Sequence, residues 1–353
     1  MENRGGNQAG RQIVNGNEDR RDLANFAGPL WLFQNLYHIP PTHTADSPPF
    51  RFRQVAILFM TRVMTSSTTA YDLIPGTMLK RYYFTHSDHL EVVMNNIKSF
   101  VQRFSLPIFF ILAYALSWVP SLFEAHSLLP LGPFFAALIV LAFWGWSNVK
   151  EFLSRIVQWR VSVTWYAMVL LLPVIGTSLA IGINLLLGTD APTWERIPPL
   201  SDLPGTFIFI LLFIGLGEEP AWRGFALPRI MKGRNALTAS AILAVLHIIW
   251  HLPLFGSDFD STNILPWMLG VSGFTIVSTW MYNRTQGNLL LPTLFHTSVN
   301  VTSSYLFGTL FTGTDLIHLW WLWAGFWWVV ALNILVKEKS IELSKPASIE
   351  LPA

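Results

Sequence analysis

The 353-residue chain contains no cysteine and few charged residues. Without cysteine, this chain has no disulfides, thiolate metal ligands, cysteine nucleophiles or lipidated thiols. Only 12% of the residues are charged and 52% are hydrophobic, whereas a soluble domain carries about a quarter charged residues. The formal net charge is +2, so there is no electrostatic case for a nucleic-acid partner. The composition predicts a protein whose solvent is a lipid bilayer.

Polar residues are concentrated toward the N-terminus. Residues 1–100 hold 10 of the 23 lysines and arginines and 8 of the 21 acids, and they open with many Gly, Asn, Arg and Asp residues. We expect a polar, partly disordered extension without an assigned function. Its apolar stretch 52–64 is too short to span a bilayer and predicts a soluble or interfacial helix. Residues 101–340 are the predicted membrane domain, and 341–353 a cytosolic tail.

Eight apolar runs follow, and each is a predicted membrane-spanning helix. A helix needs about 20 apolar residues to cross a hydrocarbon core of about 30 Å, and these runs lack the alternation of barrel strands. The fourth run is short and is expected to continue past Gly217. The predicted fold is an all-α membrane protein, a bundle of eight transmembrane helices with a polar N-terminal extension. The runs are 104–123, 128–147, 163–187, 204–217, 236–255, 264–283, 288–308 and 316–336.

The basic residues of the predicted loops support this count. If both termini face the cytosol, the inner segments hold most loop lysines and arginines, among them Arg223, Arg229 and Lys232, whereas the outer loops hold only Arg196. This bias is what the positive-inside rule describes. We therefore expect a multi-pass protein of the plasma membrane with both termini in the cytosol.

The segment after the fourth run contains two adjacent acids, Glu218 and Glu219. An acid at a helix centre costs about 2.5–3.5 kcal/mol on insertion scales, and such residues usually face the interior and are functional. Glu219 and Arg223 lie four residues apart, so they share a helical face and can pair. Glu218 then faces elsewhere and is a candidate general base. The alternative is an interfacial acid pair at a helix start, with Pro220 at an early helical position.

Two further helices carry polar pairs at the same spacing. His247 and His251 are four residues apart, the spacing of helical zinc ligands, but the acid of the zincin signature is missing between them. One of the two could be a packed histidine instead. His296 and Asn300 also share a face, and Asn300 could hold a water or an oxyanion. The alternative for this pair is a set of hydrogen bonds that join helices.

Together, the three motifs predict one water-filled pocket between helices. Hydrolysis needs a base that activates water and donors that stabilise an oxyanion. Glu218 would take the proton, and His251 and His296 would position the water, directly or through a metal. Asn300 would complete the pocket, while Glu219 and Arg223 would fix the helix and the orientation of Glu218.

This set of motifs resembles the CPBP intramembrane proteases, which comprise CAAX prenyl proteases and bacteriocin-processing or immunity-type relatives. The matching residues are Glu218-Glu219 with Arg223, His251 followed by Leu252-Pro253-Leu254-Phe255, and His296 with Asn300. The resemblance covers about residues 104–336 and includes Leu131-Gly132-Pro133. His247 departs from it, because that family has an aromatic residue at this place. His247 is therefore left out of the predicted site, as a packing residue or an extra polar group.

The resemblance implies an intramembrane endopeptidase of the CPBP type that cleaves membrane-associated or lipid-modified substrates near the cytosolic face. Prenylated proteins, peptide pheromones and bacteriocin leaders are all compatible substrates. The family name implies a metalloprotease, with a divalent metal such as zinc on His251 and His296, but the residue set also suits a glutamate-activated water without a metal. These two mechanisms stay open, because zinc sites commonly use two histidines and a carboxylate.

Two other classes of protein fit a polar pocket in a membrane bundle. The first is a transporter or proton relay, which usually shows inverted repeats; the first half of the bundle has no second Glu-Glu segment or matching histidine pair. The second is a non-catalytic scaffold. The intact acid, histidines and Asn300 argue against this class.

Overall fold

The computed structural model describes residues 76–124, 126–190, 192 and 194–338. Within these residues all regular elements are helical, and the only β-type pairing is an isolated bridge between Phe255 and Phe259. Most of the predicted extension, including the stretch 52–64, and the predicted tail 341–353 lie outside the described residues. The described part of the chain confirms the all-α prediction.

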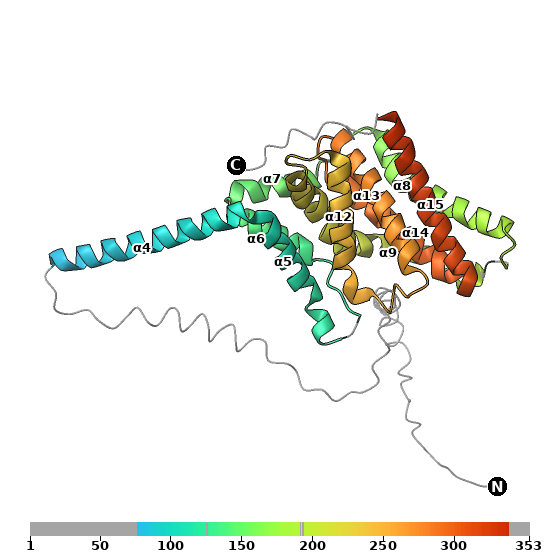
Figure 1. Ribbon diagram of the computed structural model, residues 1–353, viewed down its shortest axis with the longest axis horizontal. Coiled ribbons are helices and arrows are strands. Elements are labelled where there is room, and N and C mark those ends of the chain that lie inside the picture. The colour runs from blue at the N-terminus through green and yellow to red at the C-terminus, as the bar shows by residue number, and fades with distance from the viewer. Residues whose placement is uncertain (1–75, 125, 191, 193, 339–353) are drawn as a thin grey trace, which may run out of the picture.

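The helices follow one another with short connections, and the later ones form a bundle (Figure 1). The long helices are α4 (Gly76–Arg103), α5 (Ser105–Trp118), α6 (Gly132–Ala142), α7 (Trp146–Ile156), α8 (Val163–Leu186), α12 (Ala236–Trp250), α13 (Ile264–Arg284), α14 (Leu290–Leu310) and α15 (Gly313–Lys337). Between α8 and α12 the chain forms α9 (Leu203–Ile210), η4 (Leu211–Gly215), α10 (Leu216–Glu219), η5 (Pro220–Ala226) and α11 (Leu227–Ile230). Short 3₁₀ turns are η1 (Pro120–Leu122), η2 (Trp194–Arg196), η3 (Leu200–Asp202) and η6 (Leu252–Leu254).

The predicted number of eight membrane spans is not confirmed. Four helical segments of the described chain are long and apolar enough to cross a membrane, namely Val163–Leu186, Trp194–Ile230, Ile264–Arg284 and Gly313–Lys337. Apolar helices do occupy the other predicted places, but α6 has 11 residues and α12 has 15, which is too short for a span. Helix α14 is long enough, and its many Thr, Ser, His and Asn residues lower its hydropathy.

A fifth span is possible only if a sharply bent pair of helices counts as one. The segment Leu90–Arg103 of α4 meets α5 at an angle of 86°. Figure 1 shows α4 projecting away from the bundle. On the projecting segment, Leu90, Met94 and Ile97 are exposed.

The predicted second run, 128–147, is not one continuous helix. Helix α6 ends at Ala142, and α7 begins at Trp146, near the end of that run, and continues through the segment that was expected to be an inner loop. Helix α7 packs one side inward through Val149 and Phe152, and its buried Arg155 donates to the carbonyl of Gly287 at 2.6 Å. The anchoring partner lies 132 residues away in the sequence, so spacing along the chain gives no sign of it.

Small residues allow close helix packing in the bundle. Helix α13 packs against α12 and α15, and α8 packs against α14 and α15. A Cβ atom at Gly273 of α13 would lie 3.0 Å from the backbone of Trp327 on α15. Such close backbone approach through glycine is typical of membrane helices, where apolar surface alone does not drive association.

The outer faces of the helices are apolar, and several polar residues are buried inside the bundle. Large apolar side chains such as Ile111, Leu179 and Val329 are more than half exposed on the outer faces of the helices, whereas Thr275 and Thr297 are fully buried. Soluble proteins rarely expose large contiguous patches of apolar side chains. A bundle of this kind fits a lipid environment with polar residues gathered inside.

Candidate active site

The two adjacent acids lie in the middle of an almost continuous helical segment, Leu203 to Ile230. The predicted continuation of the fourth run past Gly217 is therefore confirmed. Helix α10, which carries both acids, is flanked by two π-helical stretches, η4 and η5. Stretches of π-helix are rare and frequently mark functional sites.

Glycines before the acids bring α10 close to its neighbours. A Cβ atom at Gly217 would lie 2.5 Å from the carbonyl oxygen of Pro130, just before α6. A Cβ atom at Gly215 would lie 2.5 Å from Oγ1 of Thr297 on α14. Larger residues at either position would push α10 away from the helices that surround the acids.

Glu219 is held by two cationic or hydrogen-bonding partners. Nη1 of Arg223 donates to Oε1 of Glu219 at 2.6 Å, and Nδ1 of His296 donates to the same oxygen at 2.9 Å. Glu219 and Arg223 are both fully buried. The predicted i, i+4 pair is therefore confirmed, and it links α10 and η5 to α14. Because a buried charge is costly without its partner, loss of either side chain would destabilise the local structure.

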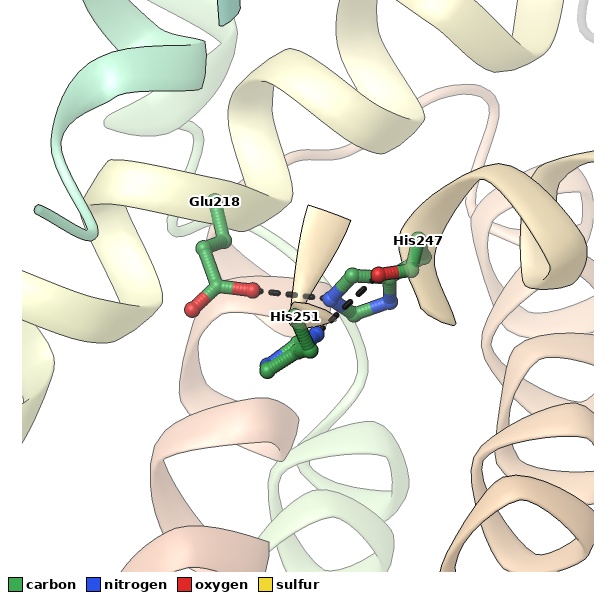
Figure 2. Close-up of side chains that lie close together, drawn as sticks. All are labelled: Glu218, His247 and His251. Atoms are coloured by element: carbon green, nitrogen blue, oxygen red, sulfur yellow. Dashed lines mark hydrogen bonds and ion pairs between the residues drawn. The ribbon is translucent and has the colours of Figure 1, made fainter. Parts of the chain in front are cut away.

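Glu218 points to a different helix. Its side chain is 3% exposed, and Nε2 of His247 on α12 donates to its Oε2 at 2.9 Å. The indole N–H of Trp222 donates to the same oxygen at a longer distance, 3.4 Å. Described residues give Glu218 no arginine or lysine partner. Figure 2 shows the carboxylate turned toward the ring of His247, with His251 beside them.

His251 lies at the C-terminal end of α12, where the chain turns into η6. Asn235 caps the start of this helix by accepting from the N–H of Thr238 at 2.7 Å, and Pro253 ends it because proline lacks the N–H that the helix needs. Nδ1 of His251 donates to the carbonyl oxygen of His247 at 3.0 Å (Figure 2). The proton is therefore on Nδ1, and the other ring nitrogen, Nε2, carries a lone pair.

Three side chains form a group that could hold a metal ion. One donor atom from each of Glu218, His247 and His251 lies within 4.8 Å of the other two. Two imidazoles and a carboxylate match the donor set of a zinc site with an open fourth position. This group differs from the pair predicted from the sequence, His251 and His296, because Nδ1 of His296 contacts Glu219 instead.

His247 is the residue that sequence reasoning left out. It is 4% exposed and contacts Glu218 directly, although it was assigned a packing or accessory role. Its i, i+4 spacing to His251 was the signal that pointed to it. Its ring also lies 5.3 Å from that of Trp222, so it packs as an aromatic as well as donating a hydrogen bond.

Asn300 is placed one helical turn after His296 on α14. It is partly buried, and no hydrogen bond joins its side chain to the other described residues. The ring centroids of His296 and His247 are 6.3 Å apart. The structure therefore gathers Glu218, Glu219, Arg223, His251 and His296 in one region, and Asn300 follows His296 by one turn without a hydrogen bond to these side chains.

Comparisons with known proteins show what the region that carries this arrangement is similar to. Residues 200–302 match the family model described as type II CAAX prenyl endopeptidase Rce1-like. The chain is also 24% identical, over 147 residues, to CAAX prenyl protease 2 of Methanococcus maripaludis, an alignment that covers 39% of this chain and 52% of the relative. The chain thus spans about half the length of the curated relative that it matches.

The matched region contains Glu218, His251, His296 and Asn300. The resemblance to CPBP proteases is thereby confirmed. Together with the apolar helices, the match supports an integral membrane protein.

Proposed function

We propose that the protein is an intramembrane endopeptidase that hydrolyses peptide bonds of membrane-associated, prenylated substrates through a glutamate-activated water. The observation that carries this proposal is that two neighbouring acids have different hydrogen-bond partners. Glu219 is neutralised by Arg223, whereas Glu218 is buried and has no cationic side chain as a hydrogen-bond partner within the described residues. A buried carboxylate without an ion pair is suited to accept a proton.

In this mechanism Glu218 removes a proton from a water molecule, and the hydroxide formed attacks the carbonyl carbon of the scissile peptide bond. The carbonyl oxygen becomes an oxyanion, which an N–H of Asn300 stabilises, while His251 and His296 position the water. Glu218 then returns the proton to the leaving nitrogen, the C–N bond breaks, and a new carboxyl and a new amine result. Glu219 and Arg223 position α10 without touching the substrate.

The polypeptide environment also suits a substrate with a lipid anchor. The outer faces of the bundle are apolar, with Ile111 and Leu179 among the exposed side chains, so a prenyl chain could approach from the bilayer. Basic residues such as Arg229, Lys232 and Arg234 follow the acid-bearing segment. By the positive-inside rule we place this end of the bundle, and both termini, on the cytosolic side of the plasma membrane. No feature of the described residues favours the transporter alternative.

The experiment is a cleavage assay with the purified full chain in liposomes. The substrates are a farnesylated peptide ending in a Cys-aliphatic-aliphatic-X motif and the same peptide without the farnesyl group, and products are identified by mass spectrometry. We expect cleavage of the farnesylated peptide, weaker cleavage of the unmodified one, and none by the Glu218→Gln variant. Cleavage by that variant at the wild-type rate would contradict the proposed base, and no cleavage of either peptide by the wild type would contradict the substrate class.

A further inference from the structure

We propose that Glu218, His247 and His251 form a zinc-binding site. The three donor atoms lie within 4.8 Å of one another, and Nε2 of His247 is 2.9 Å from Oε2 of Glu218. Two ligands that are each about 2.0 Å from a tetrahedral zinc ion are roughly 3.3 Å apart. The side chains therefore already stand near the spacing that coordination requires (Figure 2).

The protein holds the two imidazoles in orientations that suit coordination. Nδ1 of His251 donates to the carbonyl oxygen of His247, which leaves the lone pair of Nε2 available. A backbone carbonyl that accepts from the second ring nitrogen is the usual support of a metal-ligating histidine. On His247, zinc would take the place of the Nε2 proton that now faces Glu218, and that proton would move to Nδ1.

Burial and charge favour a cation at this point. Glu218 and His247 are 3% and 4% exposed. The ring centroid of His251 lies 4.7 Å from that of Trp250 and 5.0 Å from that of Trp267. Because Arg223 already neutralises Glu219, Glu218 is the carboxylate left to balance a bound ion. Two histidines and one carboxylate leave the fourth zinc position open, and Glu218 would keep its second oxygen free.

Zinc binding here does not rest on the proposed function, although a bound ion would supply a Lewis acid next to Glu218. The test is a binding measurement on the full chain, purified in detergent and stripped with a chelator. Zinc affinity is measured by competition with a chromophoric chelator, stoichiometry by elemental analysis, and ligand geometry by the visible absorption of added Co²⁺. We expect one zinc per chain and the intense absorption of tetrahedral cobalt.

The decisive variant is His247→Phe, which keeps an aromatic ring beside Trp222 but removes the nitrogen donor. We expect its zinc affinity to fall at least about 100-fold, since loss of supporting contacts alone costs 10–100-fold. His251→Gln should behave in the same way, and circular dichroism and gel filtration show whether each variant is folded. The matched control is His318→Gln, which removes an exposed histidine of α15 and should bind zinc like the wild type.

Equal zinc affinity of the wild type and a folded His247→Phe variant would overturn the proposal, as would the absence of stoichiometric binding by the wild type. The outcomes separate it from the proposed function. If the wild type cleaves the peptide but binds no zinc, the zinc-site proposal is wrong and the protease proposal stands. If zinc binds tightly in a way that depends on His247 but neither peptide is cleaved, the zinc-site proposal stands and the protease proposal is wrong.

Discussion

The two sides of α10 carry neighbouring carboxylates in opposite surroundings. On the side facing α14, Glu219 shares one oxygen between Arg223 and His296. On the side facing α12, Glu218 meets the imidazole of His247 and the indole of Trp222. The residue type and the helix are the same, so the difference comes from the side chains that each acid meets, both in its own segment and on the neighbouring helices. One side is built as a neutralised cluster, and the other leaves a carboxylate available for chemistry.

The largest expected effect is the loss of cleavage in Glu218→Gln. Glutamine keeps the size of the side chain and an oxygen that accepts from His247, but it does not take a proton from water. We expect the cleavage rate to fall by up to about 10⁴-fold, the upper end of what a general base contributes. Single-turnover cleavage in liposomes measures the rate, and an unchanged unfolding midpoint in detergent shows that the fold is intact.

Substitutions in the Glu219–Arg223 pair, on the opposite side of α10, should change the free energy of unfolding. Arg223→Met leaves Glu219 as an uncompensated buried charge, so we expect a loss of about 3–5 kcal/mol in the free energy of unfolding, measured by denaturant titration in micelles. The double variant Glu219→Gln/Arg223→Met removes both charges and should recover much of this loss. A double variant as unstable as Arg223→Met alone would show that the ion pair is not the cause.

A smaller effect on the rate is expected from Asn300→Ala. Loss of one oxyanion donor lowers kcat by about 10²-fold or more, whereas stability should not change, because no hydrogen bond joins the side chain of Asn300 to the other described residues. Steady-state kinetics with the farnesylated peptide and a parallel melting curve measure the two effects. An unchanged kcat would remove Asn300 from the proposed mechanism.

The smallest effect concerns a contact far from the acids, at the ends of α13 and α15. Hydrogen bonds from Arg284 and Trp280 hold the pKa of Glu338 below its ordinary value. A lowered pKa means that this contact stabilises the fold above the usual titration range of glutamate, and that the contribution is lost as the pH falls through the pKa of the folded state. Because the Arg284 side chain is 48% exposed, water screens this pair, and we expect Glu338→Gln to cost less than about 1 kcal/mol at neutral pH. Melting curves at neutral and acidic pH should differ between wild type and variant only at neutral pH.

The sequence predicted local features of the site well, because these depend on spacing within one helix. The pairing of Glu219 with Arg223 follows from four-residue spacing, and the separate direction of Glu218 follows from its position next to Glu219. The contact between Glu218 and His247 was missed, since the two residues are 29 positions apart and lie on different helices. Which helix faces meet depends on packing across the bundle, and no periodicity encodes it.

The helix lengths were also harder to predict than their places. Proline and glycine mark where α12 ends at Trp250 and where α6 begins at Gly132. Apolar residues continue beyond these helices, so composition alone made the runs look long enough to span a bilayer. Helix α7 was missed because its polar face resembles a loop, although Arg155 ties it to the distant Gly287.

The most direct test of the account compares the cleavage rates per folded molecule of Glu218→Gln and Glu219→Gln. Both variants are assayed with the farnesylated peptide at a temperature where both are folded. Glutamine at position 219 keeps an oxygen that accepts from Arg223 and His296, so we predict that this variant cleaves within about 10-fold of the wild type. Glu218→Gln should not cleave. Equal loss of cleavage in the two folded variants, or cleavage by Glu218→Gln, would contradict the division of roles between the neighbouring acids.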